Sequence, residues 1–355
     1  MRKIVSVLAL LLFLQVFCLP GRAEEGSWET LHQHALSLYQ SGMFSEAVTE
    51  GLKALGEAEK TAGPDSPEAA STLGLLANAW HSLGQYDEAG PYYLRALAIH
   101  EARNGPNHPD TASTLNNLAQ LRHFQARYAE SEALYRRAIE SYEKALGKDA
   151  PALATPLNNL AELYRSQGNA AAAEPLFFRA MALYEKHFGT DHPNVAMCLN
   201  NLALLYQAGG SPDQAESMFR RALAIFETLG TEHPYVAASL NNLALLLFEQ
   251  KKVTTAEPLF IGALAVYEKN FGEGHPSVAS VIHNLGELNR AKGDAKQSEA
   301  YFRRALAIKE RYLGPDHPSV AGTLENLAAL YRESGRNEEA KPLEERAAAI
   351  RRLHR

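Results

Sequence analysis

The sequence repeats itself at a nearly constant interval. Copies of Leu-Asn-Asn-Leu-Ala, intact or degenerate, start at Leu73, Leu115, Leu157, Leu199, Leu240, Ile282 and Leu324, and the steps are 42 residues except for one of 41. The dipeptide His-Pro marks the same interval at His108, His192, His233, His275 and His317, and Ser66-Pro67 and Ala150-Pro151 fill the two remaining places. Such a period predicts an array of similar units, each of which buries its apolar face against its neighbours.

Each repeat is predicted to hold two helices. Apolar residues in the first half recur at helical spacing, as Leu157, Leu160 and Tyr164 do. A glycine such as Gly168 ends the first helix, and a glycine such as Gly189, followed by the proline of His-Pro, ends the second. The sequence therefore predicts eight helix pairs, or sixteen helices, in one continuous solenoid.

Small and large residues alternate in columns that predict how the helices pack. One column is alanine throughout, and a second contains only alanine and serine: Ala54, Ala96, Ala138, Ala180, Ala222, Ala263, Ala305 and Ala347; Ala47, Ala89, Ser131, Ala173, Ala215, Ala256, Ser298 and Ala340. Small side chains let neighbouring helices approach closely. An aromatic column, from Tyr93 to Phe302, faces them and becomes Glu344 in the last unit, as expected of a capping helix that meets water.

This pattern resembles the tetratricopeptide repeat, and the long period with a Leu/Phe-Gly-x-x-His-Pro linker is similar to that of kinesin light chains and their bacterial relatives. The matching residues of one unit are His192-Pro193, Val195-Ala196, Leu199 to Ala203, Tyr206, Gly210, Ala215-Glu216, Phe219 and Arg221-Ala222. The resemblance covers residues 66–350. It implies an all-α fold, a right-handed superhelical α-solenoid of about eight helix-turn-helix repeats.

The resemblance and the N-terminal sequence together divide the chain into four segments. We expect a signal peptide at residues 1–23, a divergent first repeat without the Leu-Asn-Asn motif at 24–62, the solenoid at 63–336 and a C-terminal capping helix at 337–355. The signal is predicted from two basic residues, the apolar stretch Ile4–Phe17, Pro20, and small residues at Gly21 and Ala23. We expect cleavage after Ala23 and export to the periplasm or the medium. A retained membrane anchor is the alternative, although the stretch is short for a hydrocarbon core of ~30 Å.

Composition excludes several classes of protein. The net charge of −6 with mixed signs argues against a nucleic-acid-binding surface, and a hydrophobic content of 46 % argues against disorder. Removal of Cys18 with the signal leaves Cys198 alone, so we expect no intrachain disulfide. The His-Pro histidines recur on separate linkers, too far apart to share a metal. No catalytic motif is recognisable, and we predict no enzyme activity, no metal and no cofactor.

The first helices of such a solenoid line its concave face, and the asparagines on them are the predicted binding residues. They are Asn116, Asn117, Asn158, Asn159, Asn200, Asn201, Asn241, Asn242, Asn284 and Asn326. Asparagine is a poor residue inside a helix, but its amide both donates and accepts, so it can hold an extended peptide backbone. In similar tetratricopeptide domains, asparagines at these positions contact the peptide. The alternative is that one asparagine of each pair bonds a neighbouring helix and fixes the repeat geometry.

A further column on the same helices contains arginine. Arg165, Arg290 and Arg332 would favour an acidic partner or a C-terminal carboxylate through charge-assisted hydrogen bonds. A solvated polar face is the alternative. The sequence thus predicts an exported scaffold or adaptor that binds a peptide or protein, with a structural, self-assembling repeat protein of an envelope complex as the second hypothesis.

Overall fold

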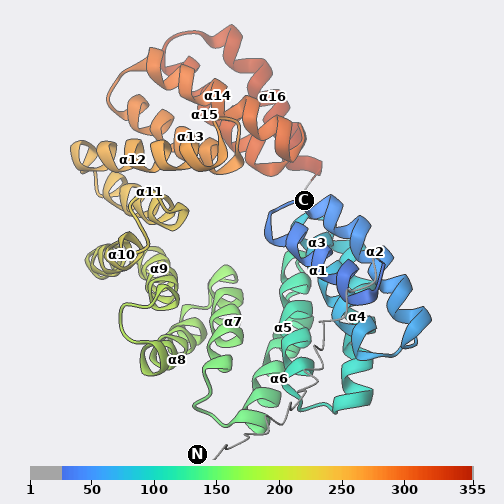
Figure 1. The fold of residues 1–355 in the computed structure, drawn as a ribbon. Coiled ribbons are helices and arrows are strands. Elements are labelled where there is room, and N and C mark those ends of the chain that lie inside the picture. Colours follow the sequence, from blue (N-terminus) through green and yellow to red (C-terminus); the bar gives the residue numbers. More distant parts are fainter. Residues whose placement is uncertain (1–25, 354–355) are drawn as a thin grey trace, which may run out of the picture. The chain divides into compact units, whose positions relative to one another are not determined.

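The computed structural model describes residues 26–353, and within this range the chain is entirely helical (Figure 1). The predicted signal peptide and Cys18 lie outside the described residues. Sixteen α-helices and one short 3-10 helix, η1 (Pro151–Leu153), follow one another there without a strand, which confirms the predicted number of helices and the all-α class. The chain divides into two compact units, residues 1–141 and 142–355, and each is described by itself.

In both units the helices pack as consecutive pairs, and each pair packs on the next. The first unit contains α1 (Trp28–Gln40), α2 (Phe44–Thr61), α3 (Pro67–Ser82), α4 (Tyr86–Asn104), α5 (Pro109–Phe124) and most of α6 (Tyr128–Leu146). The second contains α7 (Ala154–Ser166), α8 (Ala170–Phe188), α9 (Pro193–Ala208), α10 (Pro212–Glu227), α11 (Pro234–Glu249), α12 (Val253–Phe271), α13 (Pro276–Ala291), α14 (Ala295–Leu313), α15 (Pro318–Glu333) and α16 (Asn337–Leu353).

The histidine of each His-Pro dipeptide caps the first helix of its repeat. Its Nδ1 accepts a hydrogen bond from the backbone N–H two residues further on, over 3.1–3.2 Å: at Asp110, Asn194, Tyr235, Ser277 and Ser319. The following proline is the first helical residue, where its missing N–H would have had no partner. Because an acceptor Nδ1 is unprotonated, these caps require a neutral imidazole.

The core consists of the predicted columns. All sixteen small residues are at most 1 % exposed, and the aromatic column Tyr93, Tyr135, Phe177, Phe219, Phe260 and Phe302 is at most 2 % exposed. The two serines that replace alanine satisfy their hydroxyls within their own helix pair, because Ser131 donates to the carbonyl of Ala119 at 2.7 Å and Ser298 to that of Gly286 at 2.8 Å. The columns therefore set the separation of the helices, as the sequence predicts.

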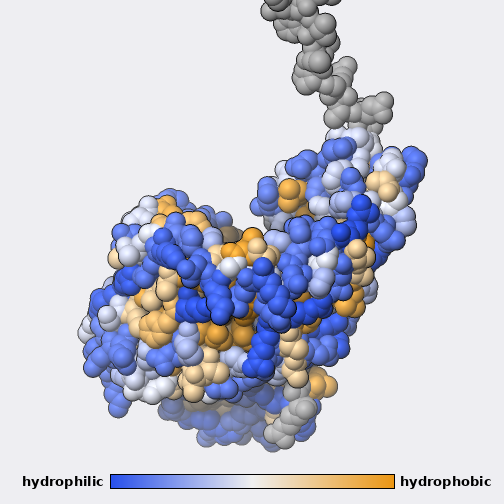
Figure 2. Space-filling model, turned by 90° about the horizontal axis from the view of Figure 1, so that it is seen from below, coloured by the Kyte–Doolittle hydropathy of each residue, from blue (hydrophilic) through white to orange (hydrophobic). Residues whose placement is uncertain are grey.

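The face shown in Figure 2 is mostly hydrophilic, with hydrophobic residues exposed between the hydrophilic ones. At the C-terminal helix α16 the aromatic column ends in Glu344, which receives two hydrogen bonds from Arg332 of α15, at 2.9 and 2.7 Å. None of the helices in residues 26–353 has the length and apolar character that crossing a bilayer requires.

Candidate functional site

The asparagines of the second unit form a ladder of hydrogen bonds between successive first helices. In each rung the second asparagine of one repeat donates its Nδ2 to the Oδ1 of the first asparagine in the preceding repeat. The rungs are Asn201 to Asn158 at 3.1 Å, Asn242 to Asn200 at 3.2 Å and Asn284 to Asn241 at 3.0 Å. We call these rungs the amide ladder. In the pairs Asn200/Asn201 and Asn241/Asn242, both asparagines thus bond a neighbouring helix through half of each amide. The alternative drawn from the sequence gave this role to only one asparagine of each pair.

The other half of each amide stays available. Among the described residues, none bonds the Nδ2 of Asn158, Asn200 or Asn241, or the Oδ1 of Asn201, Asn242 or Asn284. The side chains are half-buried, and these atoms are not among those enclosed without a partner. The face of α7, α9, α11 and α13 therefore presents free donors from the first asparagine column and free acceptors from the second.

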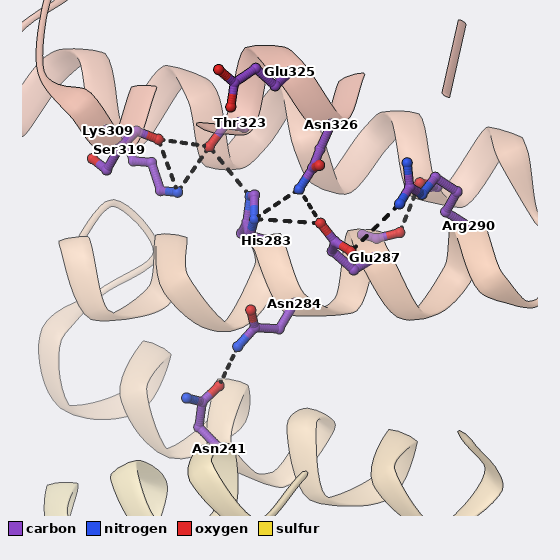
Figure 3. A network of polar contacts seen from close by, with 12 residues as sticks. Asn241, His283, Asn284, Glu287, Arg290, Lys309, Ser319, Thr323, Glu325 and Asn326 are labelled. Atoms are coloured by element: carbon purple, nitrogen blue, oxygen red, sulfur yellow. Dashed lines mark hydrogen bonds and ion pairs between the residues drawn. The ribbon is translucent and has the colours of Figure 1, made fainter. Parts of the chain in front are cut away.

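The last rung replaces the first asparagine by a histidine (Figure 3). His283 lies between Asn326, whose Nδ2 is 3.2 Å from its Nε2, and Thr323, whose hydroxyl is 3.3 Å from its Nδ1. Burial lowers the pKa of His283 to about 4, so the ring is neutral at ordinary pH. Since the Nδ2 of Asn326, which faces Nε2, can only donate, Nε2 is the acceptor and Nδ1 carries the proton. Asn326 also donates to Glu287.

Lys309 of α14 extends this network. Its Nζ donates to the Thr323 hydroxyl at 2.9 Å, and burial lowers its pKa. His283, Lys309 and Thr323 were not among the residues predicted from the sequence. His283 could have been found from the repeat register alone, because it occupies an asparagine position, whereas the contact with Lys309 needed the packing of α14 against α15.

Asn116 and Asn117 also bond each other. Asn116 is buried and donates to the Oδ1 of Asn117 at 3.1 Å within its own pair, and Asn159 makes further contacts of its own. Asn117 faces a cavity of the first unit instead.

That cavity, of about 530 Å³, lies over α1, α3 and α5 and reaches the end of α4. Its polar lining includes His32, Asn78, His100, Arg103, Asp110 and Asn117. Burial lowers the pKa of both His32 and His100, so both rings favour the neutral form. Sequence reasoning missed this cavity because the first repeat lacks the Leu-Asn-Asn motif and because the lining comes from four separate helices, α1, α3, α4 and α5, that only packing brings together.

The arginine column is paired with carboxylates of the chain itself. Arg165 donates to Glu162, at 2.8 Å from Nε, and Arg332 binds Glu344. Arg290 lies 3.7 Å from both Glu287 and Glu333. An acidic ligand would therefore have to displace an internal carboxylate. Gln207, in the same column, donates to Glu249 at 2.7 Å.

Cys198 is a core residue. Its side chain is fully buried, and burial raises the pKa of the thiol to about 12, so it stays protonated. Its Sγ lies 3.8 Å from the Oδ1 of Asn158, beneath a ladder rung. Within the described part of the chain, no three histidine, cysteine or acidic side chains are grouped to hold a metal ion.

Comparison with family models decides the family. A model described as tetratricopeptide repeat matches residues 77–144, 123–186, 152–228, 235–311 and 278–352, well over half of the chain, and a second model of the same description matches residues 32–109. The chain belongs to the tetratricopeptide-repeat family. The resemblance drawn from the sequence is thereby confirmed, and a comparison with curated proteins finds no match.

Several solved structures are similar to this chain. BtubC (BKLC) from P. vanneervenii is 29 % identical over 64 % of this chain and 90 % of that one, with a TM-score of 0.52. A putative kinesin light chain of Podosopora anserina is 24 % identical over 57 % of this chain and 95 % of that one, with a TM-score of 0.49. The apo form of the quorum sensor NprR from B. thuringiensis is 14 % identical over 91 % and 87 % of the two chains, with a TM-score of 0.67, and so shares the fold.

Proposed function

We propose that this tetratricopeptide protein is an exported scaffold or adaptor that binds a polypeptide along the amide ladder. The single observation that carries the proposal is the free half of each ladder amide. Asparagines already held in place by one hydrogen bond present a second polar group to solvent at little further cost in side-chain entropy.

The chemistry fits an extended peptide. A peptide unit offers one N–H donor and one C=O acceptor, and the ladder offers an acceptor from its second column and a donor from its first. Because these bonds read the backbone, the ladder itself selects for an extended conformation, and sequence preference comes from neighbouring side chains. The arginine column adds a preference for acidic groups, provided that these displace Glu344 from Arg332 or Glu162 from Arg165.

The experiment separates the two halves of one amide. Asn200→Asp keeps the Oδ1 that accepts from Asn242 but removes the free donor, whereas Asn200→Ala removes both. We expect the Asp variant to lose partner binding several-fold at an unchanged unfolding midpoint, and the Ala variant to lose binding together with about 1 kcal/mol of stability.

The control is Thr254→Asp, which adds the same charge on the exposed surface of α12. Proteins that the immobilised chain retains from extracts of its own cells are identified by mass spectrometry for each variant. Partners kept by Thr254→Asp and lost by Asn200→Asp support the ladder as the binding face. If Asn200→Asp retains the same partners in the same amounts, the proposal fails.

Partner chemistry and location have their own tests. If a terminal carboxylate exchanges with Glu344 at Arg332, amidation of a captured peptide's C-terminus weakens its binding, and an equal affinity of the two forms contradicts this. For export, mass spectrometry of the protein from its own cells should give an N-terminus at Glu24 in the periplasmic or secreted fraction. An intact N-terminus in the cytoplasmic fraction would contradict export.

A further inference from the structure

The second helices carry a periodic arginine that joins each repeat to the one before it. Each guanidinium pairs with a glutamate of the preceding second helix: Arg95 with Glu59, Arg137 with Glu101, Arg179 with Glu143, Arg221 with Glu185, Arg304 with Glu268 and Arg346 with Glu310. Five of the six also donate to a carbonyl of the linker that precedes the next first helix: Arg95 to Pro64, Arg179 to Lys148, Arg221 to Thr190, Arg304 to Glu273 and Arg346 to Pro315. One carboxylate and one carbonyl thus make a guanidinium site in five repeats.

At the remaining position the arginine is absent but its two acceptors are present. Gly262 of α12 occupies the arginine position, one residue before Ala263 of the alanine column. Glu227 of α10 and the carbonyl of Thr231 are the corresponding acceptors. Neither is bonded by a side chain of the described residues, and Glu227 is exposed.

The backbone around these acceptors keeps the corresponding glycine and histidine hydrogen bonds of the occupied sites, with one residue fewer between Glu227 and the glycine. In the preceding repeat, the N–H of Gly189 bonds the carbonyl of Glu185 at 3.0 Å; here Gly230 bonds Glu227 at the same distance. In both repeats the backbone N–H of the linker histidine, His192 or His233, donates to the carbonyl of that glycine. The repeat that is one residue shorter therefore absorbs the deletion in the turn that follows α10, between Glu227 and Gly230.

The end of α12 still lies against this linker. Asn270 donates to the carbonyl of Glu232 at 2.8 Å, and Lys269 pairs with the Glu232 carboxylate. His187 makes the equivalent contact with the carbonyl of Asp149 in another repeat, at 2.7 Å. Two contacts recur at the linkers: one made by the arginine and one made by the side chain near the end of the second helix. Only the arginine contact is missing here.

The missing side chain leaves room at the surface. A Cβ built on Gly262 would meet only Leu240, at 3.5 Å, which is an ordinary contact. Beside it Ile261 is 52 % exposed, where the neighbouring repeats have Arg220 and Arg303. Each neighbouring repeat has two arginines at these positions. Here they are replaced by the exposed Ile261 and by the open space over Gly262, next to the unpaired carboxylate of Glu227.

We call the empty arginine position at Gly262, together with its acceptors on Glu227 and Thr231, the vacant rung. We infer that the vacant rung binds an arginine side chain of a partner polypeptide. The Glu227 carboxylate and the Thr231 carbonyl receive the guanidinium, and Ile261 contacts an apolar residue next to that arginine. Arginine is favoured over lysine because its planar group donates to two acceptors at once, as it does in the five occupied sites. The vacant rung lies on second helices and on a linker, so it does not depend on the amide ladder.

The probes are three acetylated and amidated pentapeptides, Gly-Leu-X-Leu-Gly, in which X is arginine, lysine or the neutral isostere citrulline. Binding to the full chain is followed by the backbone amide signals of Gly230, Thr231 and Glu232 in nitrogen-15 NMR spectra. We expect the arginine peptide to shift these signals in a saturable manner, and the citrulline and lysine peptides to bind several-fold more weakly.

Variants decide whether the response comes from the vacant rung. Glu227→Gln should weaken binding of the arginine peptide several-fold, and Gly262→Arg should abolish it because the chain's own guanidinium fills the rung. Gly262→Ala, which leaves the rung open, should bind as the unaltered chain does. Equal binding of arginine and citrulline peptides, no shift of these signals, or unchanged binding to Gly262→Arg would overturn the inference.

Discussion

Substituting Gly286 by alanine tests how far the repeat pattern can predict stability. Every other copy of the motif has alanine at this place, and alanine is favoured over glycine inside a helix by about 1 kcal/mol. The repeat alone therefore predicts that Gly286→Ala stabilises the protein. The structure predicts the opposite.

A Cβ at position 286 would lie 2.7 Å from two ring atoms of Phe302, whereas ordinary contacts begin at 3.4 Å. Phe302 is completely buried and packs against Leu327, Ala328 and Tyr331, so its ring has no open space to enter. Overpacking of this kind costs about 1–3 kcal/mol, which outweighs the gain in helix propensity and leaves a net loss of about 1 kcal/mol.

The assay is chemical unfolding followed by circular dichroism, with Gly262→Ala as the matched control. That substitution is the same, in the same unit, but its Cβ makes only an ordinary contact, so we expect a gain of up to about 1 kcal/mol. The double variant Gly286→Ala with Phe302→Leu should lose less than the two single losses added together, because the smaller side chain relieves the clash. If Gly286→Ala stabilises the protein as much as Gly262→Ala does, the packing argument is wrong.

Three further outcomes follow. Gly262→Arg should stabilise more than Gly262→Ala, by up to about 1 kcal/mol for the restored ion pair with Glu227; chemical unfolding measures the difference, and Glu227→Gln should remove it. Ala180→Leu should destabilise by about 1–3 kcal/mol in the same assay, because the alanine column has no free space; a neutral result would contradict close packing there. Burial lowers the pKa of His275 from 6.5, so its cap contributes fully above that pH and is lost as the pH falls towards the lower folded pKa. Unfolding midpoints from about pH 8 to about pH 5 should accordingly fall less for His275→Asn, which keeps an uncharged cap; parallel curves would refute this role.

Much of the fold can be predicted from the sequence because equivalent residues make the same packing contacts in every repeat. The period locates the helices, the glycines and prolines mark their ends, and the small and aromatic columns identify the core. All of these depend on local spacing or on one contact that recurs in every unit. The role of the His-Pro histidine as a cap needed the structure, although its position did not.

The candidate site was predicted only in part. The register identified the asparagines of the ladder and the arginines beside them, but not what each side chain bonds. Asn242 reaches Asn200 across a repeat boundary, and Arg332 reaches Glu344 of the capping helix. Such pairings depend on the separation and rotation of neighbouring helices, which no single repeat encodes.

The sequence by itself determined that this protein is an array of helix pairs with a closely packed core, because periodic spacing and residue size suffice for that. Only the tertiary structure decided that half of each ladder amide is already used, that the arginine column is internally paired, and that the rung at Gly262 is vacant beside an unpaired Glu227. The physical reason is that a hydrogen bond or an ion pair requires two groups at a specific distance and direction, and only the packing of successive repeats sets both.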